Sequence, residues 1–98
     1  MIIVSDASPI ISLARAGLLG LLRDLFHQVV IPFEVYQEVV VQGKGKAGAQ
    51  ETESADWIMI EEVKDRHLIG ILQVHGLSMM DAATIALARE KKAHFVII

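Results

Sequence analysis

Three acidic residues, Asp6, Glu38 and Asp81, are the side chains whose types and positions could support chemistry. They lie far apart along the chain, so only a fold could gather them. Carboxylates that are brought together repel one another unless a cation joins them. A ligand set made of oxygen atoms alone selects Mg²⁺ or Mn²⁺ over zinc. Such ions can polarise a phosphate and activate a water for in-line attack. The three acids therefore predict a metal site that acts on phosphate esters.

Each acid also has an ordinary structural interpretation. Asp6 precedes a predicted helix, where its carboxylate could bond to the local backbone in an Asx turn. Asp81 follows Ser78 by three positions, which resembles a capping box with Asp in place of Glu or Gln. Glu38 follows Glu34 by four positions, and a solvated helix face tolerates two carboxylates at this spacing. The local sequence leaves both interpretations open for each acid.

The elements that would position these acids alternate along the chain. Apolar, β-branched segments predict strands, and amphipathic patterns between them predict helices. Ser8 is expected to cap the first helix, with Pro9 at its first position and Gly17 just beyond its end. Residues 43–54 form the most loop-like segment, part of which could be helical. The expected strands are 1–4, 28–31, 57–60 and 95–98, and the expected helices are 9–16, 18–26, 33–42, 66–74 and 80–92.

Strands that alternate with helices imply a three-layer α/β/α fold, in which helices cover both faces of a parallel sheet. Ligands of such sheets bind at the carboxyl ends of the strands, near the point where the winding reverses. Asp6 directly follows the first strand, and Asp81 opens the helix that leads to the last one. The fold class thus predicts that these two acids share one edge of the sheet.

Length and composition limit the function further. The chain has 98 residues, of which 53% are hydrophobic, and this suits one small packed domain over residues 1–98. Its formal charge of −3 gives no broad attraction for nucleic acid, so any polyanion must be handled locally or through metal ions. The absence of cysteine excludes disulfides and thiolate metal sites, and a cytoplasmic location is expected. No apolar run approaches the roughly 18 residues that cross a membrane.

Other polar residues give weaker signals. The four histidines show no spacing typical of a metal site or a catalytic triad. The segment "GKGKAG", residues 43–48, lacks the spacing of a phosphate-binding loop and does not follow a strand. Its two lysines, Lys44 and Lys46, could meet a phosphate, although a flexible solvated loop is the commoner origin of such a pattern.

Three segments in the expected order resemble PIN-domain proteins, and in particular a branch of short, VapC-like proteins. The first is "IIVSDASPIISLARAGLLGLLRDLFHQVVIPFEVYQEVV", residues 2–40, with its strand, acid, hydroxyl residue and "IP..V..EV" helix. The second is "ADWI", residues 55–58, and the third is "DAATIALAREKKAHFVII", residues 81–98, an acid that opens an Ala-rich helix before a strand. Each motif is weak alone, and their order makes the match specific.

The resemblance implies a Mg²⁺- or Mn²⁺-dependent endoribonuclease, often the toxin of a toxin–antitoxin pair. Carried over by position, Asp6, Glu38 and Asp81 would be the catalytic and metal-binding acids. Ser8 would match the family's hydroxyl residue near the first acid, as a substrate or supporting residue. Glu34 matches no family acid. The implied partners are RNA and an antitoxin protein.

The resemblance also implies that a further acid-bearing segment, a strand and a helix should follow the fourth strand, so residues 1–98 would form an incomplete domain. An apolar edge strand at residues 95–98 would then favour a dimer. The alternative is a catalytically impaired PIN-like remnant that acts as an interaction module. A receiver-like signalling domain is disfavoured, because the adjacent acids after the first strand and the lysine after the last strand that such domains use are not visible.

Overall fold

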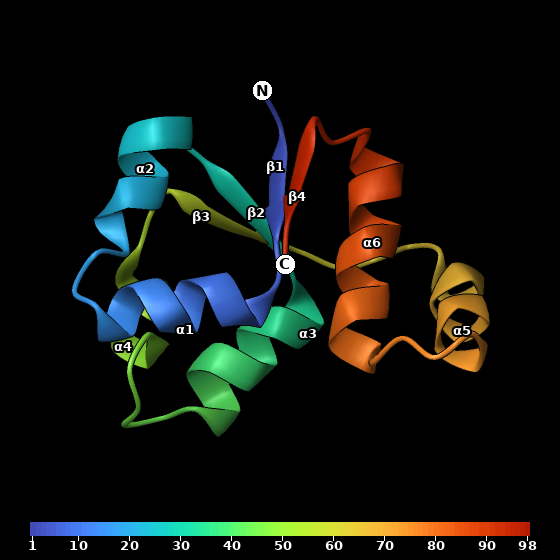
Figure 1. The fold of residues 1–98 in the computed structure, drawn as a ribbon, viewed down its shortest axis with the longest axis horizontal. Helices are drawn as coiled ribbons and strands as arrows, with labels where there is room; N and C mark the ends of the chain where they lie inside the picture. The colour runs from blue at the N-terminus through green and yellow to red at the C-terminus, as the bar shows by residue number, and fades with distance from the viewer.

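Four short strands form one parallel sheet at the centre of the molecule (Figure 1). The computed structural model describes all residues from 1 to 98. The strands are β1 (Ile3–Ser5), β2 (Val29–Pro32), β3 (Ile58–Glu61) and β4 (Phe95–Ile97). Their bounds differ by one or two residues at most from those expected. The predicted parallel α/β sheet is confirmed.

The order of the strands across the sheet is β3-β2-β1-β4, so the winding reverses beside β1. The chain builds the sheet outward from β1 through β2 to β3, and it then returns to place β4 on the other side of β1. Val4 of β1 pairs with Val30 of β2 and with Val96 of β4. The carboxyl end of β1 is therefore the position at which a doubly wound sheet offers its ligand crevice.

Helices cover both faces of the sheet, which confirms the three-layer arrangement (Figure 1). One side carries α1 and α2, and the other carries α6 with α5 outside it. A short helix does form within the loop-like segment 43–54. The helices are α1 (Ala7–Arg15), α2 (Gly20–Phe26), α3 (Phe33–Tyr36), η1 (Gln37–Gln42), α4 (Ala49–Ser54), α5 (Arg66–Val74) and α6 (Met79–Lys91).

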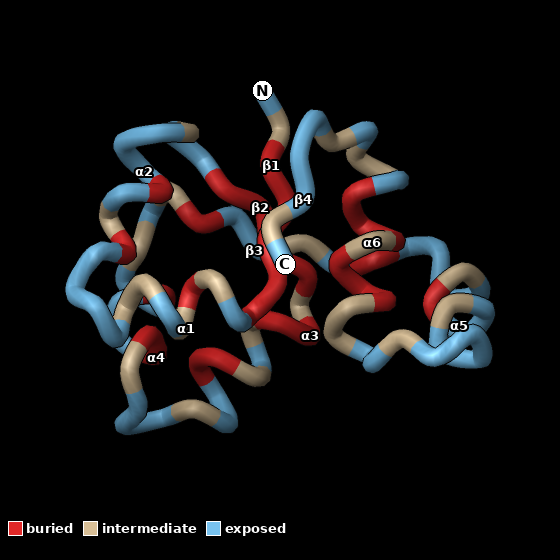
Figure 2. The backbone as a smooth tube through the Cα atoms, in the orientation of Figure 1, coloured by how far each residue is buried: buried red, intermediate tan, exposed pale blue.

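The sheet separates two apolar cores, because successive residues of a strand point to opposite faces. Val29 and Ile31 of β2 pack with α1, α2 and η1, whereas Val30 packs with α5 and α6 on the other face. Small residues of α6, such as Ala82 and Ala86, let that helix approach the sheet closely. The buried segments in Figure 2 follow the two central strands, β1 and β2, and the inner sides of the helices, whereas the edge strands are largely exposed.

The first helix begins earlier than the sequence predicts. Asp6, and not Ser8, is its N-cap: the Asp6 carboxylate accepts a hydrogen bond of 2.7 Å from the backbone N–H of Ala7. Ser8 and Pro9 then occupy the first turn, where a missing proline N–H leaves no helix bond unmade. Gly17 follows the helix with a φ of +73°, as expected of a residue just beyond a helix end.

The predicted helix 33–42 consists of two parts. The first turn, α3, is α-helical, and η1 continues it as a π-helix, a rare form that often occurs at functional sites. Gly43 ends η1 in close contact with it: a Cβ at this position would lie 2.4 Å from the carbonyl oxygen of Val39 and 3.1 Å from that of Glu38. Only glycine fits this turn without a backbone shift.

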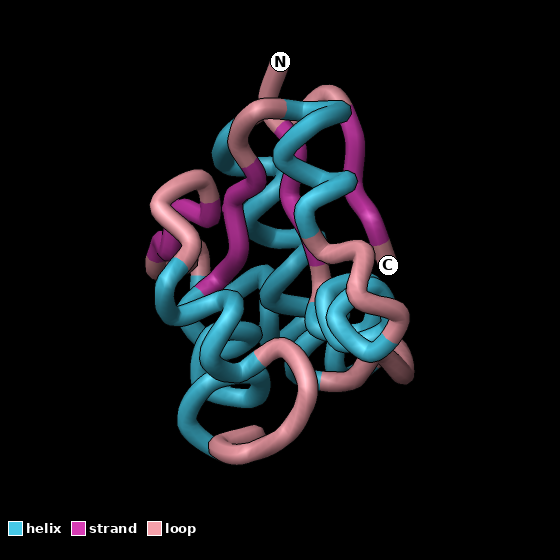
Figure 3. Tube along the Cα trace, turned by 90° about the vertical axis from the view of Figure 1, so that its left-hand side faces the viewer, coloured by secondary structure: helices cyan, strands magenta, loops and turns pink.

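The strand β4 lies at an open edge of the sheet, as expected. Phe95 and Ile98 are 56% and 67% exposed. The C-terminus lies at the end of this edge strand, on the outside of the molecule (Figure 3). None of the helices combines the length and the apolar character needed to cross a membrane.

Candidate metal and phosphodiester site

Asp6 is held firmly at the carboxyl end of β1. Its side chain and backbone are only 5% exposed. Its backbone N–H donates a 2.8 Å hydrogen bond to the carbonyl of Ile97, which ties the switch point of β1 to the edge strand β4. The buried Ser5 hydroxyl donates a 2.9 Å bond to the Asp6 carbonyl. Together with the bond from Ala7, these contacts fix both the backbone and the carboxylate of Asp6.

The carboxyl groups of Asp6 and Asp81 lie close enough for their interaction to raise the pKa of Asp6. The pKa of Asp6 is raised to about 6, first by burial and then by the interaction with the Asp81 carboxyl group, against the opposing effect of the Ala7 N–H. The negative charges of Asp81 and Glu38 also favour the protonated form of Asp6. Two carboxyl groups can share a bond only when one of them carries a proton. Asp6, with its raised pKa, would be the natural donor.

Asp81 reaches this position from the first turn of α6. The Ser78 hydroxyl caps the helix by accepting a 3.1 Å bond from the Asp81 backbone N–H, as the capping-box interpretation predicts. The carboxyl group of Asp81 points to Asp6 and not back to the cap. The structural and the functional interpretations of Asp81 are thus compatible, because its backbone serves the helix and its side chain is free for the site.

Glu38 belongs to η1, and it lies farther from Asp6 than Asp81 does. Its charge acts on Asp6, but the two carboxyl groups share no hydrogen bond. As the side chains stand, no three His, Asp or Glu residues are arranged as the ligands of one metal ion. The fold therefore brings the predicted acids into one neighbourhood, with Asp6 and Asp81 in contact and Glu38 beside them.

The donor set fits a divalent cation in its chemistry. A buried carboxyl group beside a half-buried one, with a third acid nearby, is an unfavourable arrangement in the absence of positive charge. A cation would replace the Asp6 proton and would remove the repulsion. Its ligands would be oxygen atoms only, which suits Mg²⁺ or Mn²⁺.

Ser8 and Glu34 do not take part in the contact between Asp6 and Asp81. Ser8 is exposed on the first turn of α1, two positions beyond Asp6, and its hydroxyl makes no bond to the acids. The expectation that Glu34 lies on a solvated helix face is wrong. Glu34 is 9% exposed and forms an ion pair with Arg66 at the start of α5, and its Oε1 atom is buried without a partner. It links α3 to α5.

Sequence reasoning missed two residues that shape the site. Ser5 is a fully buried hydroxyl residue in an otherwise apolar strand, and its polarity directly before Asp6 was the available signal. Gly43 controls the turn after Glu38, but nothing in the local sequence distinguishes it from the other glycines of the segment 43–48.

The fold and the acids define a small, doubly wound α/β protein with a carboxylate cluster at its switch point. A family described as a PIN domain matches residues 2–98, so the chain belongs to the PIN-domain family. Membership suggests a nuclease-type function, RNA as a ligand and dependence on a divalent metal ion. No curated protein and no solved structure matches the chain.

Proposed function

We propose that this protein is a metal-dependent endoribonuclease. The convergence of Asp6, Asp81 and Glu38 at the carboxyl end of β1 carries the proposal. These three acids would hold Mg²⁺ or Mn²⁺, which when bound would supply Lewis-acid stabilisation of charge on the phosphate and lower the pKa of a water molecule. The proposal accounts for the one strongly perturbed carboxyl group of the chain.

The chain's own residues position this chemistry. The hydrogen bond that the Ala7 N–H donates to the Asp6 carboxylate, and the one that the Asp6 N–H donates to the Ile97 carbonyl, hold Asp6 on a rigid strand end, which a catalytic ligand needs. Burial of Asp6 and the contact with Asp81 make loss of the Asp6 proton unfavourable until a cation binds. Ser8 is exposed on the first turn of α1 and would contact a substrate rather than the metal.

RNA cleavage tests this proposal. The wild-type protein should cleave a single-stranded RNA with Mn²⁺ and not with EDTA, and Asp6→Asn should lose the activity while keeping the helix cap, since Asn caps as well as Asp. Asp56→Asn, which changes an exposed acid in the loop before β3, is the matched control. Cleavage without metal, or an active Asp6→Asn variant, would contradict the proposal.

We also propose that the enzyme is the toxin of a toxin–antitoxin pair. A small ribonuclease without a membrane-spanning helix suits a toxin that acts on cytoplasmic RNA and is restrained by an antitoxin protein. A test is expression in growing cells: the wild type should arrest growth, and Asp6→Asn should not. Normal growth with abundant, active wild-type protein would argue against the toxin role.

A second candidate rests on the open edge of the sheet. Phe95 and Val96 are exposed on β4, and an apolar edge strand pairs readily with another chain. A PIN-like module that dimerises or binds a partner through β4, without catalysis, would use this edge. Sedimentation analysis of the wild type and Val96→Lys tests the dimer: the variant should be monomeric, and two identical monomeric profiles would exclude it.

A further inference from the structure

An open pocket of about 270 Å³ adjoins the acidic cluster. It lies between α1, η1 and the turn that follows η1. Its polar side chains are Arg15 at the end of α1, Glu38 and Gln42 of η1, and Lys46. Glu38 belongs both to this pocket and to the acids around Asp6. The pocket is thus a direct extension of the candidate site.

The turn that carries Lys46 is docked on the helices, contrary to the flexible solvated loop that its composition suggests. The backbone N–H of Lys46 donates a 2.8 Å bond to the carbonyl of Gly43. Gly48 is buried with a φ of +94°, and a Cβ there would lie 3.5 Å from the Cβ of Ala14 and 3.6 Å from Val39. The lysine side chain therefore starts from a fixed backbone and faces a defined pocket.

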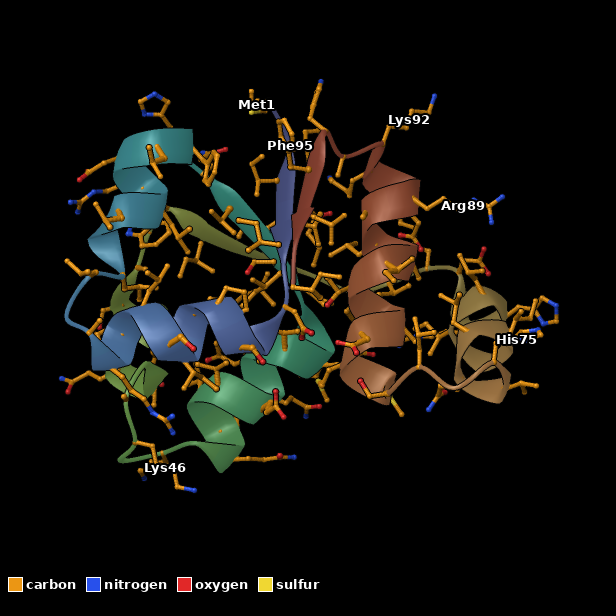
Figure 4. The ribbon with its side chains drawn as sticks, in the orientation of Figure 1. Met1, Lys46, His75, Arg89, Lys92 and Phe95 are labelled. Carbon is orange, nitrogen blue, oxygen red and sulfur yellow. The ribbon has the colours of Figure 1, made fainter.

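The two lysines of this turn have different surroundings. Lys46 shares its pocket with Arg15, so two cations face a single carboxylate, that of Glu38. Lys46 lies between this pocket and a neighbouring one that contains Glu51 and Glu53, and it lines both, whereas Lys44 lines the neighbouring pocket and not the one with Arg15. An anion is favoured beside Arg15 and disfavoured beside Lys44. In Figure 4, Lys46 lies at the opposite end of the molecule from Arg89 and Lys92, so these cations cannot serve the same ligand.

We infer that Arg15 and Lys46 bind a phosphate of the RNA strand near the one that is cut. This inference rests on the proposed function, because it takes RNA as the ligand. Arginine suits the role, since its planar guanidinium can hold two phosphate oxygens, and the Gln42 amide offers a further donor. A net charge of −3 for the chain makes such a local pair of cations necessary for holding a polyanion.

The helix α1 sets the path of the strand. Ser8, Ile11 and Arg15 follow one another at helical spacings of three and four, so they lie along one side of α1. The helix runs for about 13 Å from Asp6 to Arg15 at its usual rise per residue. A strand that enters the acidic cluster beside Ser8 would therefore pass along α1 into the pocket. Ile11, in the pocket wall, offers an apolar contact for a base or a sugar.

Binding of a short fluorescein-labelled single-stranded RNA, measured by anisotropy in EDTA, tests the inference separately from cleavage. Arg15→Ala and Lys46→Ala should each raise Kd by about fivefold, and each should reduce the slope of log Kd against log salt by about 0.7. Lys44→Ala, with the same change of charge two residues away, is the control and should bind as the wild type. Circular dichroism checks that all variants fold; these side chains are exposed, so no loss of structure is expected.

Unchanged binding by Arg15→Ala and Lys46→Ala would overturn the inference, and so would an equal loss with Lys44→Ala. Competition separates a strand from a free anion: inorganic phosphate should displace the RNA only weakly, and strong displacement would overturn the assignment to a strand. If the wild type binds RNA with these residues but never cleaves it with Mn²⁺, the proposed nuclease fails and the phosphate subsite stands.

Discussion

The carboxyl groups of Asp6 and Asp81 lie within interaction distance of each other, although 75 positions separate the two residues in the sequence. Asp6 is fixed at the end of β1, and Asp81 is fixed by the start of α6. The sheet order explains the meeting, because the winding reverses beside β1 and the chain returns through α6 to place β4 there. When both carboxyl groups are ionised they repel each other, and a bound cation would offset this repulsion.

The first prediction concerns pH and stability without metal. The Asp6 pKa is raised from 3.8 to about 6, so between these pH values the folded state binds a proton that the unfolded state has released. This group therefore makes the protein less stable as pH rises through that window, by about 3 kcal/mol in total. Asp6→Asn removes the effect and should be more stable than the wild type at neutral pH.

Thermal unfolding in EDTA at pH values below and above the window measures this difference. The gain of Asp6→Asn over the wild type should be large above the window and small below it. At about 4–8 °C per kcal/mol for a domain of this size, the upper value is easily resolved. A variant less stable than the wild type at neutral pH would show that the Asp6 carboxylate is not in conflict with its neighbours.

The second prediction concerns the metal ion. Mn²⁺ should stabilise the wild type, because a ligand at a hundred times its Kd adds about 2.7 kcal/mol to the free energy of unfolding. Asp6→Asn and Asp81→Asn should lose most of this gain, and Asp56→Asn should keep it. Thermal unfolding with and without Mn²⁺ gives the comparison. Equal stabilisation of all four proteins would place the ion elsewhere.

The third prediction concerns Gly43. An added Cβ would meet the Val39 carbonyl at 2.4 Å, so Gly43→Ala must shift the backbone of η1, which carries Glu38. We expect a loss of about 1–3 kcal/mol in the free energy of unfolding and a fall in RNA cleavage through misplacement of Glu38. Gly70→Ala is the matched control: it lies in α5 with open space around it and should stabilise by about 0.5–1 kcal/mol. Full cleavage by Gly43→Ala would show that η1 tolerates the shift.

The fourth prediction concerns the pair of Glu34 and Arg66. Arg66→Ala leaves the buried Glu34 carboxylate without its cation, at a cost of about 1–3 kcal/mol. Because Arg66 is half-exposed, we expect the lower part of this range. Adding Glu34→Gln should restore part of the loss, and Arg89→Ala should stay within about 0.5 kcal/mol of the wild type. Urea unfolding of the four proteins tests this, and no recovery in the double variant would exclude the pairing.

Much of the fold follows from local sequence, because β-branched segments and helical stripes report burial directly. The N-cap of α1 does not, since Asp6 and Ser8 are both good caps and only the sheet decides where β1 ends. Glu34 was misassigned because its partner, Arg66, lies 32 positions away and leaves no mark on the local pattern. The three acids were predicted as a set. Which two of them lie closest together depends on the strand order, which the sequence pattern leaves open.

A crystal structure of the wild type soaked with Mn²⁺ and examined for anomalous scattering would show whether these acids bind a metal ion. We expect a peak between the carboxyl groups of Asp6 and Asp81, with Glu38 turned toward it. The absence of a peak there, in crystals where Asp6 and Asp81 are ordered and Mn²⁺ is bound at another place, would contradict it.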